Sequence, residues 1–353
     1  MKKACVAPLL TGICAWLALV SAQGALAEVV ADLYAASVPV TEQSSKVLDS
    51  ASKEAMEEVL VKVSGSKRVL QYPGIAAALK DARSHVLQYS YVRGKPPAPA
   101  LSLRFEFDGR YITDLVTESG APLWTANRPA VLVWIVVEDE QGRHFINQET
   151  APDEAQLLVE AFSRRGVPVQ FPVFDLQDTA AISTGDVWSL DAIAIQRASA
   201  RYDAQEVVAG RLAVTSTGTS LGDWSYFRED DRINRSVTVP DLQAFLNSGV
   251  NIVAADMASR YAVAPTSSAD DSGLRLTITG ISNYKDYAAL ANWLENLELV
   301  EYANLEAVQG ERVEFRLLAK TDAARLAGII ELNERLTAIP TLGDATQLNY
   351  QWR

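Results

Sequence analysis

Hydrophobic residues recur at helical spacing early in the chain. From Val47 to Val63, apolar side chains occupy every third or fourth position and Lys and Glu fill many positions between them, so the pattern predicts an amphipathic helix that Gly65 can close. Strand patterns are expected at 29–40, 86–92 and 100–107, and shorter helices at 74–85 and 110–118. We therefore predict a small α+β domain over residues 28–126.

A continuous apolar run at 130–137 opens the second region. Such a run is typical of a strand that is buried on both faces of a sheet. Further strand patterns lie at 167–171, 206–215, 221–228 and 232–239, and helical patterns lie at 152–165, 189–202 and 242–257. Because helices and strands alternate, we predict a layered α/β domain over residues 127–265.

The small polar residues at 266–273 predict a linker. Beyond it, strand patterns at 274–281, 300–308, 312–319 and 347–352 are interrupted by helical patterns at 284–297 and 322–333. This βαββαβ order fits a ferredoxin-like domain over residues 274–353. The predicted fold class is therefore mixed, α+β and α/β, in three small modules.

The first 27 residues have the pattern of a cleavable export signal. Two lysines precede an apolar stretch, and Ala25-Leu26-Ala27 offers the small-x-small sequence at which such signals are cut. Cys14 lies in the apolar stretch, but Ile13 stands where a lipid-attachment site needs a small residue, so we expect no lipid anchor. No later segment reaches the roughly 18 unbroken apolar residues of a transmembrane helix. We expect a soluble periplasmic protein that begins at Glu28.

Charge and cysteine content argue against several functions. The chain of 353 residues has 32 Lys and Arg against 44 Asp and Glu, a formal net charge of -12, and a field of that sign repels nucleic acid. Both cysteines, Cys5 and Cys14, lie inside the export signal. The exported chain would therefore have neither a disulfide nor a thiolate metal site.

Motifs for catalysis are weak. Ser64-Gly65-Ser66-Lys67 has the spacing of the SxxK motif of penicillin-binding enzymes, but that chemistry needs the serine at the start of a helix, and Ser64 ends a predicted one. His85 and His144 are the only histidines, and the usual zinc sites need more. The sequence has no Walker, GxGxxG or GxSxG motif. We expect no cofactor and no metal.

Acidic clusters lie at three predicted turns, 138–140, 229–231 and 270–271. None has the alternating spacing of a calcium-binding loop, so we interpret them as solvated turn residues. A pair of catalytic carboxylates assembled from distant positions, as in glycosidases, leaves no local pattern. A hydrolase with dispersed carboxylates therefore stays open as an alternative.

The hairpin predicted at 221–239 carries the one aromatic cluster with a possible binding role. In a strand of period two, Trp224 and Tyr226 share the core face and Phe227 points outward. Core filling is the simpler explanation for aromatic strands. The alternative is a site for a basic partner, in which Phe227 is the apolar anchor and acidic side chains form the rim. The acidic rim would comprise Asp223, Glu229, Asp230 and Asp231.

Two sequence blocks, VLVKVSG at 59–65 and NRPAVLVW at 127–134, together with Asp32-Leu33-Tyr34, resemble an uncharacterised family of exported proteins from Gram-negative bacteria, classed as a domain of unknown function. This resemblance implies no activity and no site residues. In its order of elements, the segment 130–254 resembles the amino-terminal domain of TolB and the lipoprotein activators of penicillin-binding proteins. Those are periplasmic binding modules without catalysis, so this second resemblance implies a binding role by analogy.

We therefore predict a non-catalytic binding or assembly protein of the cell envelope, whose partner is another envelope protein. We expect neither a nucleic-acid partner nor a cofactor. Two alternatives stay open: an envelope hydrolase that uses dispersed carboxylates, and a protein that binds a small ligand between its domains.

Overall fold

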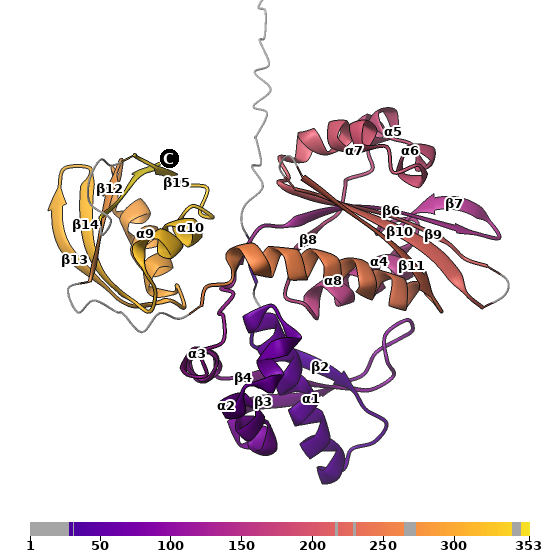
Figure 1. Cartoon of the computed structure of the whole chain (residues 1–353), viewed down its shortest axis with the longest axis horizontal. Coiled ribbons are helices and arrows are strands. Elements are labelled where there is room, and N and C mark those ends of the chain that lie inside the picture. The colour runs from indigo at the N-terminus through magenta and orange to yellow at the C-terminus, as the bar shows by residue number, and fades with distance from the viewer. Residues whose placement is uncertain (1–27, 31, 216–217, 229–230, 265–272, 341–346) are drawn as a thin grey trace, which may run out of the picture.

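Four β-sheets and their helices make up the described part of the computed structural model (Figure 1). The structure describes residues 28–30, 32–215, 218–228, 231–264, 273–340 and 347–353. The predicted export signal, all but the last residue of the predicted linker, and the acidic residues Glu229 and Asp230 lie outside this part of the chain. The mixture of helices with separate sheets confirms the predicted fold class. Within the described ranges, no helix is long and apolar enough to cross a membrane.

The first module is a three-stranded antiparallel sheet covered by helices. Strand β4 (Ser102–Phe107) lies between β2 (Ala35–Pro39) and β3 (Val86–Val92). The remaining elements are α1 (Ser45–Ser64), α2 (Pro73–Ala78), α3 (Gly109–Glu118) and the 3-10 helices η1 (Lys67–Gln71) and η2 (Leu79–His85).

Helix α1 confirms the amphipathic helix expected near the start of the chain. The Ser44 hydroxyl accepts a hydrogen bond from the Val47 N–H (3.3 Å) and caps the amino terminus of the helix. Gly65 ends it with a φ of 74°, a left-handed conformation that an L-residue with a side chain adopts only with strain. The apolar stripe of α1 packs against the sheet, with Met56, Val59 and Leu60 fully buried.

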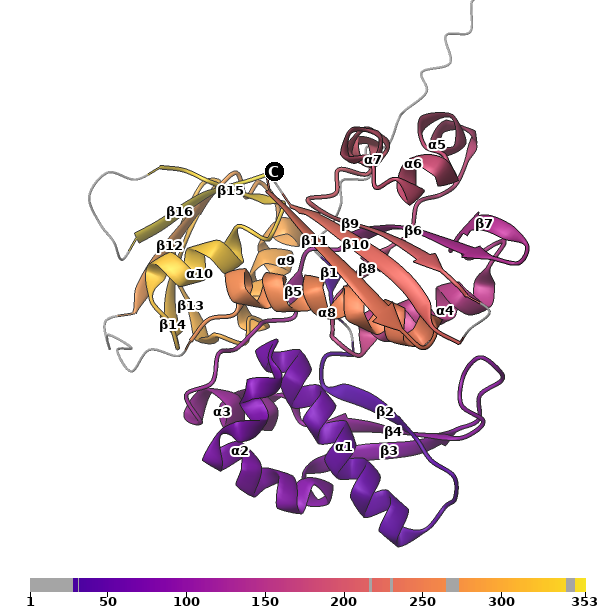
Figure 2. The ribbon, with the colours of Figure 1, turned by 45° about the vertical axis from the view of Figure 1, so that its right-hand side comes forward.

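The second module is a six-stranded sheet with helices on both faces. Its strands follow the order β11-β10-β9-β6-β7, and β8 also pairs with β6. They are β6 (Val131–Asp139), β7 (Gly142–Phe145), β8 (Val169–Gln170), β9 (Glu206–Ala213), β10 (Ser220–Arg228) and β11 (Asp231–Val239). Helices α4 (Pro152–Ser163) and α8 (Leu242–Tyr261) cover one face, and α5 (Leu176–Ala181), α6 (Thr184–Trp188) and α7 (Ala192–Ser199) cover the other (Figure 2).

Strand β6 lies in the interior of this sheet. Every residue from Val131 to Val137 is buried, and the side chains alternate between the two helical layers, so the expected strand with two buried faces is confirmed. On the α8 side, Trp224 fits between Gly210 and Gly249, where an added Cβ would lie 2.6 and 2.3 Å from the indole ring. These two glycines let α8 pack closely on the sheet.

The third module has the expected βαββαβ order with one added strand. Its elements are β12 (Leu274–Thr279), α9 (Tyr284–Glu295), β13 (Val300–Gln309), β14 (Arg312–Ala319), α10 (Ala323–Ile330), β15 (Leu336–Ala338) and β16 (Gln347–Trp352). The sheet order is β13-β14-β12-β16-β15. In the expected βαββαβ order, each helical crossover keeps the direction of the strands and the single hairpin reverses it. The last strand would then run antiparallel to β12, yet β16 pairs with β12 in parallel. The reason is that β15 precedes β16 and forms an antiparallel pair with it, which reverses the chain once more.

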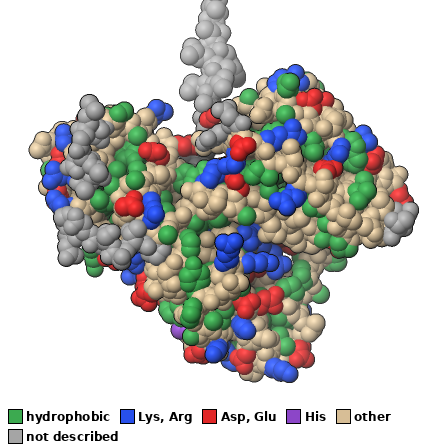
Figure 3. All heavy atoms as spheres, viewed as in Figure 1, with side chains coloured by type: hydrophobic (Ala, Val, Ile, Leu, Met, Phe, Trp, Pro, Cys, Tyr) green, Lys and Arg blue, Asp and Glu red, His purple; other side chains and the backbone are tan. Residues whose placement is uncertain are grey.

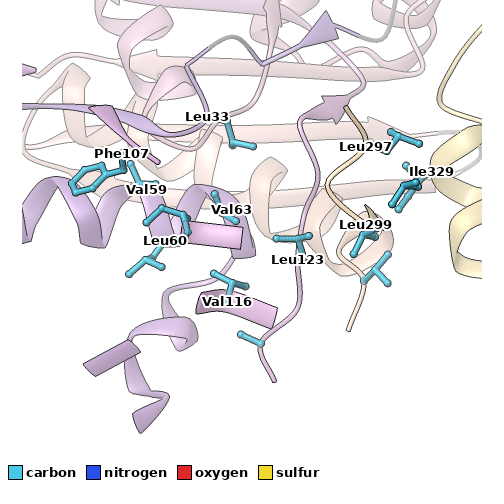
Figure 4. Close-up of a cluster of buried hydrophobic side chains, with 14 of the residues drawn as sticks. Leu33, Val59, Leu60, Val63, Phe107, Val116, Leu123, Leu297, Leu299 and Ile329 are labelled. Carbon is cyan, nitrogen blue, oxygen red and sulfur yellow. The ribbon is translucent and has the colours of Figure 1, made fainter. Parts of the chain in front are cut away.

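The first and third modules share one cluster of buried apolar side chains (Figure 4). Leu123 lies between Val63 and Val116 of the first module and Leu297 and Leu299 of the third. Helices α4 and α8 of the second module lie between the six-stranded sheet and the first module (Figures 1 and 2). All three modules therefore meet at the segment that follows Leu123.

This meeting point contains a two-stranded sheet. Strand β1 (Glu28–Val29) pairs antiparallel with β5 (Asn127–Arg128), directly before the chain enters β6. Leu123 and Val263 exchange backbone hydrogen bonds of 2.8 Å, and so connect the end of the first module to the segment just after α8. Backbone hydrogen bonds thus hold the chain on both sides of this meeting point of the three modules, which we call the junction.

Candidate functional site

Arg128 is fully buried where the three modules meet. Its Nη2 donates to the carbonyls of Lys62 (2.8 Å) and Trp124 (2.7 Å), its Nη1 to that of Gly166 (2.6 Å), and its Nε to that of Thr125 (2.8 Å). The guanidinium carbon also lies 3.7 Å from the centre of the Trp124 ring. Burial lowers the pKa of Arg128. Backbone carbonyls and an aromatic face thus stabilise this buried cation.

Lys62 links the VLVKVSG and NRPAVLVW segments, because Arg128 of NRPAVLVW donates to the carbonyl of Lys62 in VLVKVSG. The Lys62 side chain is also buried; its Nζ donates to the carbonyl of Ala35 on β2 (2.7 Å) and lies 3.2 Å from a Glu58 carboxylate oxygen. Burial lowers the pKa of Lys62, and the carboxylate of Glu58 opposes that effect. The charged residues of both blocks therefore serve to hold backbone segments in place.

Glu298 adds the third module to the junction. Its Oε1 accepts hydrogen bonds from the Ala126 N–H (2.8 Å) and the Tyr34 hydroxyl (3.5 Å), and that hydroxyl lies 3.2 Å from the hydroxyl of Thr113. Burial raises the pKa of both Glu298 and Tyr34. Groups with perturbed pKa values gather both at active sites and in structural networks. Here they bind backbone groups and each other, which indicates a structural network that fixes the three modules relative to one another.

Glu206 is a fully buried acid in the sheet of the second module. Its carboxylate accepts hydrogen bonds from Arg260 (2.8 Å) and from the hydroxyl of Tyr226. Arg260 also donates to Asp256 (3.0 Å). Burial and the carboxylate of Glu206 raise the pKa of the Tyr226 phenol, so the phenol stays protonated and donates.

A second fully buried acid, Asp178, lies on the face of the sheet covered by α5, α6 and α7, which form the outer helical layer. It accepts hydrogen bonds from Arg201 (3.0 Å), from the hydroxyl of Tyr202 and from the Phe174 N–H (2.8 Å). Like Glu206, it is therefore paired with an arginine and a tyrosine. Among the described residues, no group of three or more His, Cys, Asp or Glu is placed to hold a metal ion.

Phe227 is buried, with 4 % of its surface exposed, so the prediction that it points outward is wrong. Its side chain belongs to the cluster that contains Leu132, Trp134 and Ile195, beneath the outer helical layer. Alternation along a strand places residues on opposite faces, but here helices cover both faces of the sheet. The same alternation does place Trp224 and Tyr226 together on the α8 side, as expected. Phe227 in this position cannot anchor a partner at the surface.

Two of the acids expected to form a rim around Phe227 have separate partners on neighbouring strands. Asp223 is half-buried and accepts hydrogen bonds from Arg211 (2.9 Å) and from Ser236. Asp231 is exposed and pairs with Arg228 (2.7 Å). Glu229 and Asp230 lie outside the described residues. A role for these acids in binding a partner stays a prediction.

Ser64 and the two histidines make local contacts. The Ser64 hydroxyl is buried at the end of α1 and donates to the Ser66 carbonyl (3.1 Å). The His85 ring stacks on Tyr111 with 4.0 Å between ring centres. His144 Nε2 lies 3.1 Å from a Glu154 carboxylate oxygen. The position of Ser64 at the end of a helix agrees with the sequence-based expectation.

Exposed apolar side chains mark two edge strands for which the sequence had predicted no binding role. Strand β3 is an edge of the first sheet, and β13 is an edge of the third. Edge strands present unpaired backbone groups and are ready to pair with another chain. The exposed apolar residues are Leu87, Tyr89 and Val92 on β3, and Tyr302, Leu305 and Val308 on β13. The exposed edge at β3 could have been inferred from its sequence, VLQYSYV, which contains no charged residue.

Comparison with protein families gives a match to the first part of the chain. Residues 27–125 match a family described as a domain of unknown function (DUF8605), and this range corresponds to the first module. No curated protein matches the chain. The expected likeness to an uncharacterised family is thus confirmed for this part of the chain. The NRPAVLVW block lies beyond the match, and the likeness of the second module to TolB stays a prediction.

Proposed function

We propose that the protein is a non-catalytic binding protein of the cell envelope, which holds an extended, basic segment of a second protein against strand β13. The observation that supports this most directly is the outer edge of β13. Exposed apolar and acidic side chains occur there together, next to backbone groups that no other described strand pairs with.

The position of β13 suits the addition of a strand. Figure 1 shows it at the outer margin of the third module. Leu305 and Val308 lie opposite Phe315 and Val313 of β14, whose side chains are buried beneath the helices of this module. Leu305 and Val308 therefore extend the apolar core to the rim of the sheet. A segment added in the extended conformation would complete the backbone ladder and place alternate side chains beside them.

Charge on β13 favours a basic partner. Glu301 and Glu306 occupy the two irregular positions of the strand. Arg316 forms a close ion pair with Glu306, whereas Lys320 lies 4.0 Å from Glu301 and 2.8 Å from Asp114, so Glu301 is the less neutralised of the two acids. The whole chain has a net charge of -12, although Lys and Arg side chains gather where the first and second modules meet (Figure 3). Long-range attraction between the negatively charged chain and a basic segment speeds their association. Two copies of β13, in contrast, would bring their acidic side chains together and repel each other.

The sequence supports the envelope as the place of action. Residues 1–27 have the pattern of an export signal, and cleavage after Ala27 would leave Glu28 as the first residue. Mass spectrometry of the protein from a periplasmic fraction should therefore find Glu28 at the amino terminus. An amino terminus at Met1 would contradict this location, and an acylated Cys14 would contradict cleavage after Ala27 and place the protein on a membrane surface.

Selection from a displayed library of random peptides tests the binding site. We expect enriched peptides to combine Lys or Arg with alternating apolar residues. Binding should weaken by about tenfold or more in Leu305→Lys, which removes an apolar contact and adds a repelling charge. Leu221→Lys is the matched control, because Leu221 is similarly exposed but lies on β10 of the second module.

Amide hydrogen exchange locates the peptide independently. Binding should slow the exchange of amides in β13, since an added strand gives them hydrogen-bond partners, and added salt should weaken the binding. A library that yields no peptide, or peptides whose binding survives Leu305→Lys, would refute the proposal.

A further inference from the structure

We propose a second contact at a different place: two copies of the chain associate through strand β3, so that their three-stranded sheets join into one antiparallel sheet. The argument rests on the edges of the first module and is independent of the partner proposed for β13.

The two edges of this sheet differ in how they are protected. At the β2 edge, Pro39 ends the strand and the Ala35 carbonyl is occupied by Lys62 (2.7 Å). At the β3 edge, the sequence VLQYSYV provides neither a charge nor a proline, and no other described strand pairs with its outer side. Proteins usually protect an edge strand with charges, proline or a covering element, and an edge without them readily pairs with another strand. The unprotected edge is therefore the one that indicates an interface.

Two tyrosines, one exposed and one half-buried, line the β3 edge. Tyr89 and Tyr91 lie opposite Phe105 and Leu103 of β4, which are buried, so both tyrosines belong to the helix-covered face of the sheet. Tyr89 is nevertheless 48 % exposed, because nothing in the described chain continues this face beyond β3. A neighbouring strand would cover it.

A second copy provides a neighbour that matches. With a two-fold axis at Ser90, Tyr89 of one copy lies opposite Tyr91 of the other, and this aromatic pair forms twice. Because β3 has no charged residue, the strand meets itself without repulsion between like charges, whereas β11 and β13 both carry charges. Figure 2 shows β3 as the strand of this sheet farthest from the second module, so a second copy can approach it.

The association should be reversible. A seam between two short strands is smaller than the roughly 1,200 Å² at which stable interfaces begin. Sedimentation velocity over a concentration series should therefore show exchange between monomer and dimer for the unmodified chain. A chain that stays monomeric throughout the series would refute the proposal.

Two serines provide a matched pair of variants. Ser90 on β3 and Ser37 on β2 are both exposed and both lie opposite Arg104, so they occupy the same row of the sheet at its two edges. Ser90→Lys would place two lysines opposite each other at the two-fold axis and should weaken dimerisation by at least about tenfold. Ser37→Lys adds the same charge beside the same arginine at the other edge and should leave dimerisation unchanged.

A charge-swap experiment separates loss of the interface from loss of folding. Chains with Ser90→Lys and chains with Ser90→Glu should each stay largely monomeric, but a mixture of the two should form heterodimers, because lysine and glutamate then lie opposite each other. Restored association in the mixture shows that both variants are folded and that β3 meets β3. If the mixture stays monomeric, or if Ser37→Lys disrupts the dimer as strongly as Ser90→Lys, β3 does not form the interface.

Discussion

The guanidinium of Arg128 donates a hydrogen bond of 2.8 Å to the carbonyl of Lys62, across 66 residues of sequence. This bond joins the last turn of α1 to the short strand that leads into the six-stranded sheet. Because Arg128 also holds the carbonyls of Trp124, Thr125 and Gly166, one side chain satisfies four buried acceptors. Those acceptors would otherwise lack partners in the interior, where an unsatisfied carbonyl is costly.

Replacement of Arg128 should therefore destabilise the protein strongly. We expect Arg128→Met to lower the free energy of unfolding by at least about 3 kcal/mol, because several buried carbonyls lose their donor. Arg128→Lys keeps the charge but offers a compact ammonium in place of the planar fork, so its loss should be smaller. Denaturant unfolding measures both, with Arg235→Met at an exposed position as the control. Equal stability of Arg128→Met and Arg235→Met would show that the junction contributes little.

Gly65→Ala should cost more than backbone strain alone. Gly65 has a φ of 74°, and an added Cβ would lie 2.2 Å from the Cβ of Ala258 on α8. Gly120 has nearly the same φ, 73°, and no atom lies within 4 Å of the added Cβ, so Gly120→Ala measures the strain by itself. We expect about 1 kcal/mol for Gly120→Ala and about 1–3 kcal/mol more for Gly65→Ala, from overpacking against α8. Thermal unfolding of the two variants should show this order, and the reverse order would contradict the close contact.

Phe227→Ala should reduce stability and leave peptide binding unchanged. Removal of a buried phenylalanine typically costs about 3–5 kcal/mol, since it leaves a cavity. Leu221→Ala on the same strand removes an exposed side chain and should change the free energy of unfolding by no more than about 0.5 kcal/mol. Stability and affinity are to be measured on the same preparations. A folded Phe227→Ala chain with weakened affinity would return the hairpin to consideration as a binding site.

Glu298 should make the stability depend on pH. Burial raises the pKa of Glu298, and the attraction of Arg128 opposes this effect without cancelling it. Between the unfolded pKa, about 4.3, and the higher folded pKa, the folded state binds more protons than the unfolded state, so this group's contribution to stability falls as the pH rises through that window. Glu298→Gln keeps an oxygen that can accept from Ala126 and Tyr34 but has no charge to bury.

The stability of Glu298→Gln relative to the parent chain should therefore increase across that window and then become constant. Urea unfolding at a series of pH values measures it, with Glu295→Gln at an exposed position of α9 as the control. A variant whose stability differs from that of the parent by the same amount at every pH would show that the pKa of Glu298 is not raised.

Long elements could be predicted from the sequence because their apolar pattern repeats over several turns or a whole buried run. Helices α1 and α8 and strand β6 are examples, since each presents an extended apolar surface to the core. Short elements were missed. Helices α5 and α6 have six and five residues, too few for a period to show. Their capping residues, Asp175 and Ser183, were the signal that could have revealed them.

Contacts at the junction could not be predicted, because they depend on how the modules pack. Arg128, Lys62 and Glu298 come from three distant parts of the chain. One local signal existed: Lys62 interrupts the apolar run VLVKV, and a charge in such a run must be buried with a partner. The error at Phe227 had a similar origin, because alternation gives the face of a residue but not whether another layer covers that face.

The apolar cluster that the first and third modules share should couple their unfolding. Leu123 belongs to the beginning of the chain, but Leu297 and Leu299 cover it, so neither module can lose its structure without exposing the other's interior. We therefore expect them to melt in one cooperative transition, although the whole second module separates them in the sequence. A fragment restricted to residues 27–125 would expose this shared surface to water and aggregate. The smallest piece that folds by itself is then larger than the segment that matches a family.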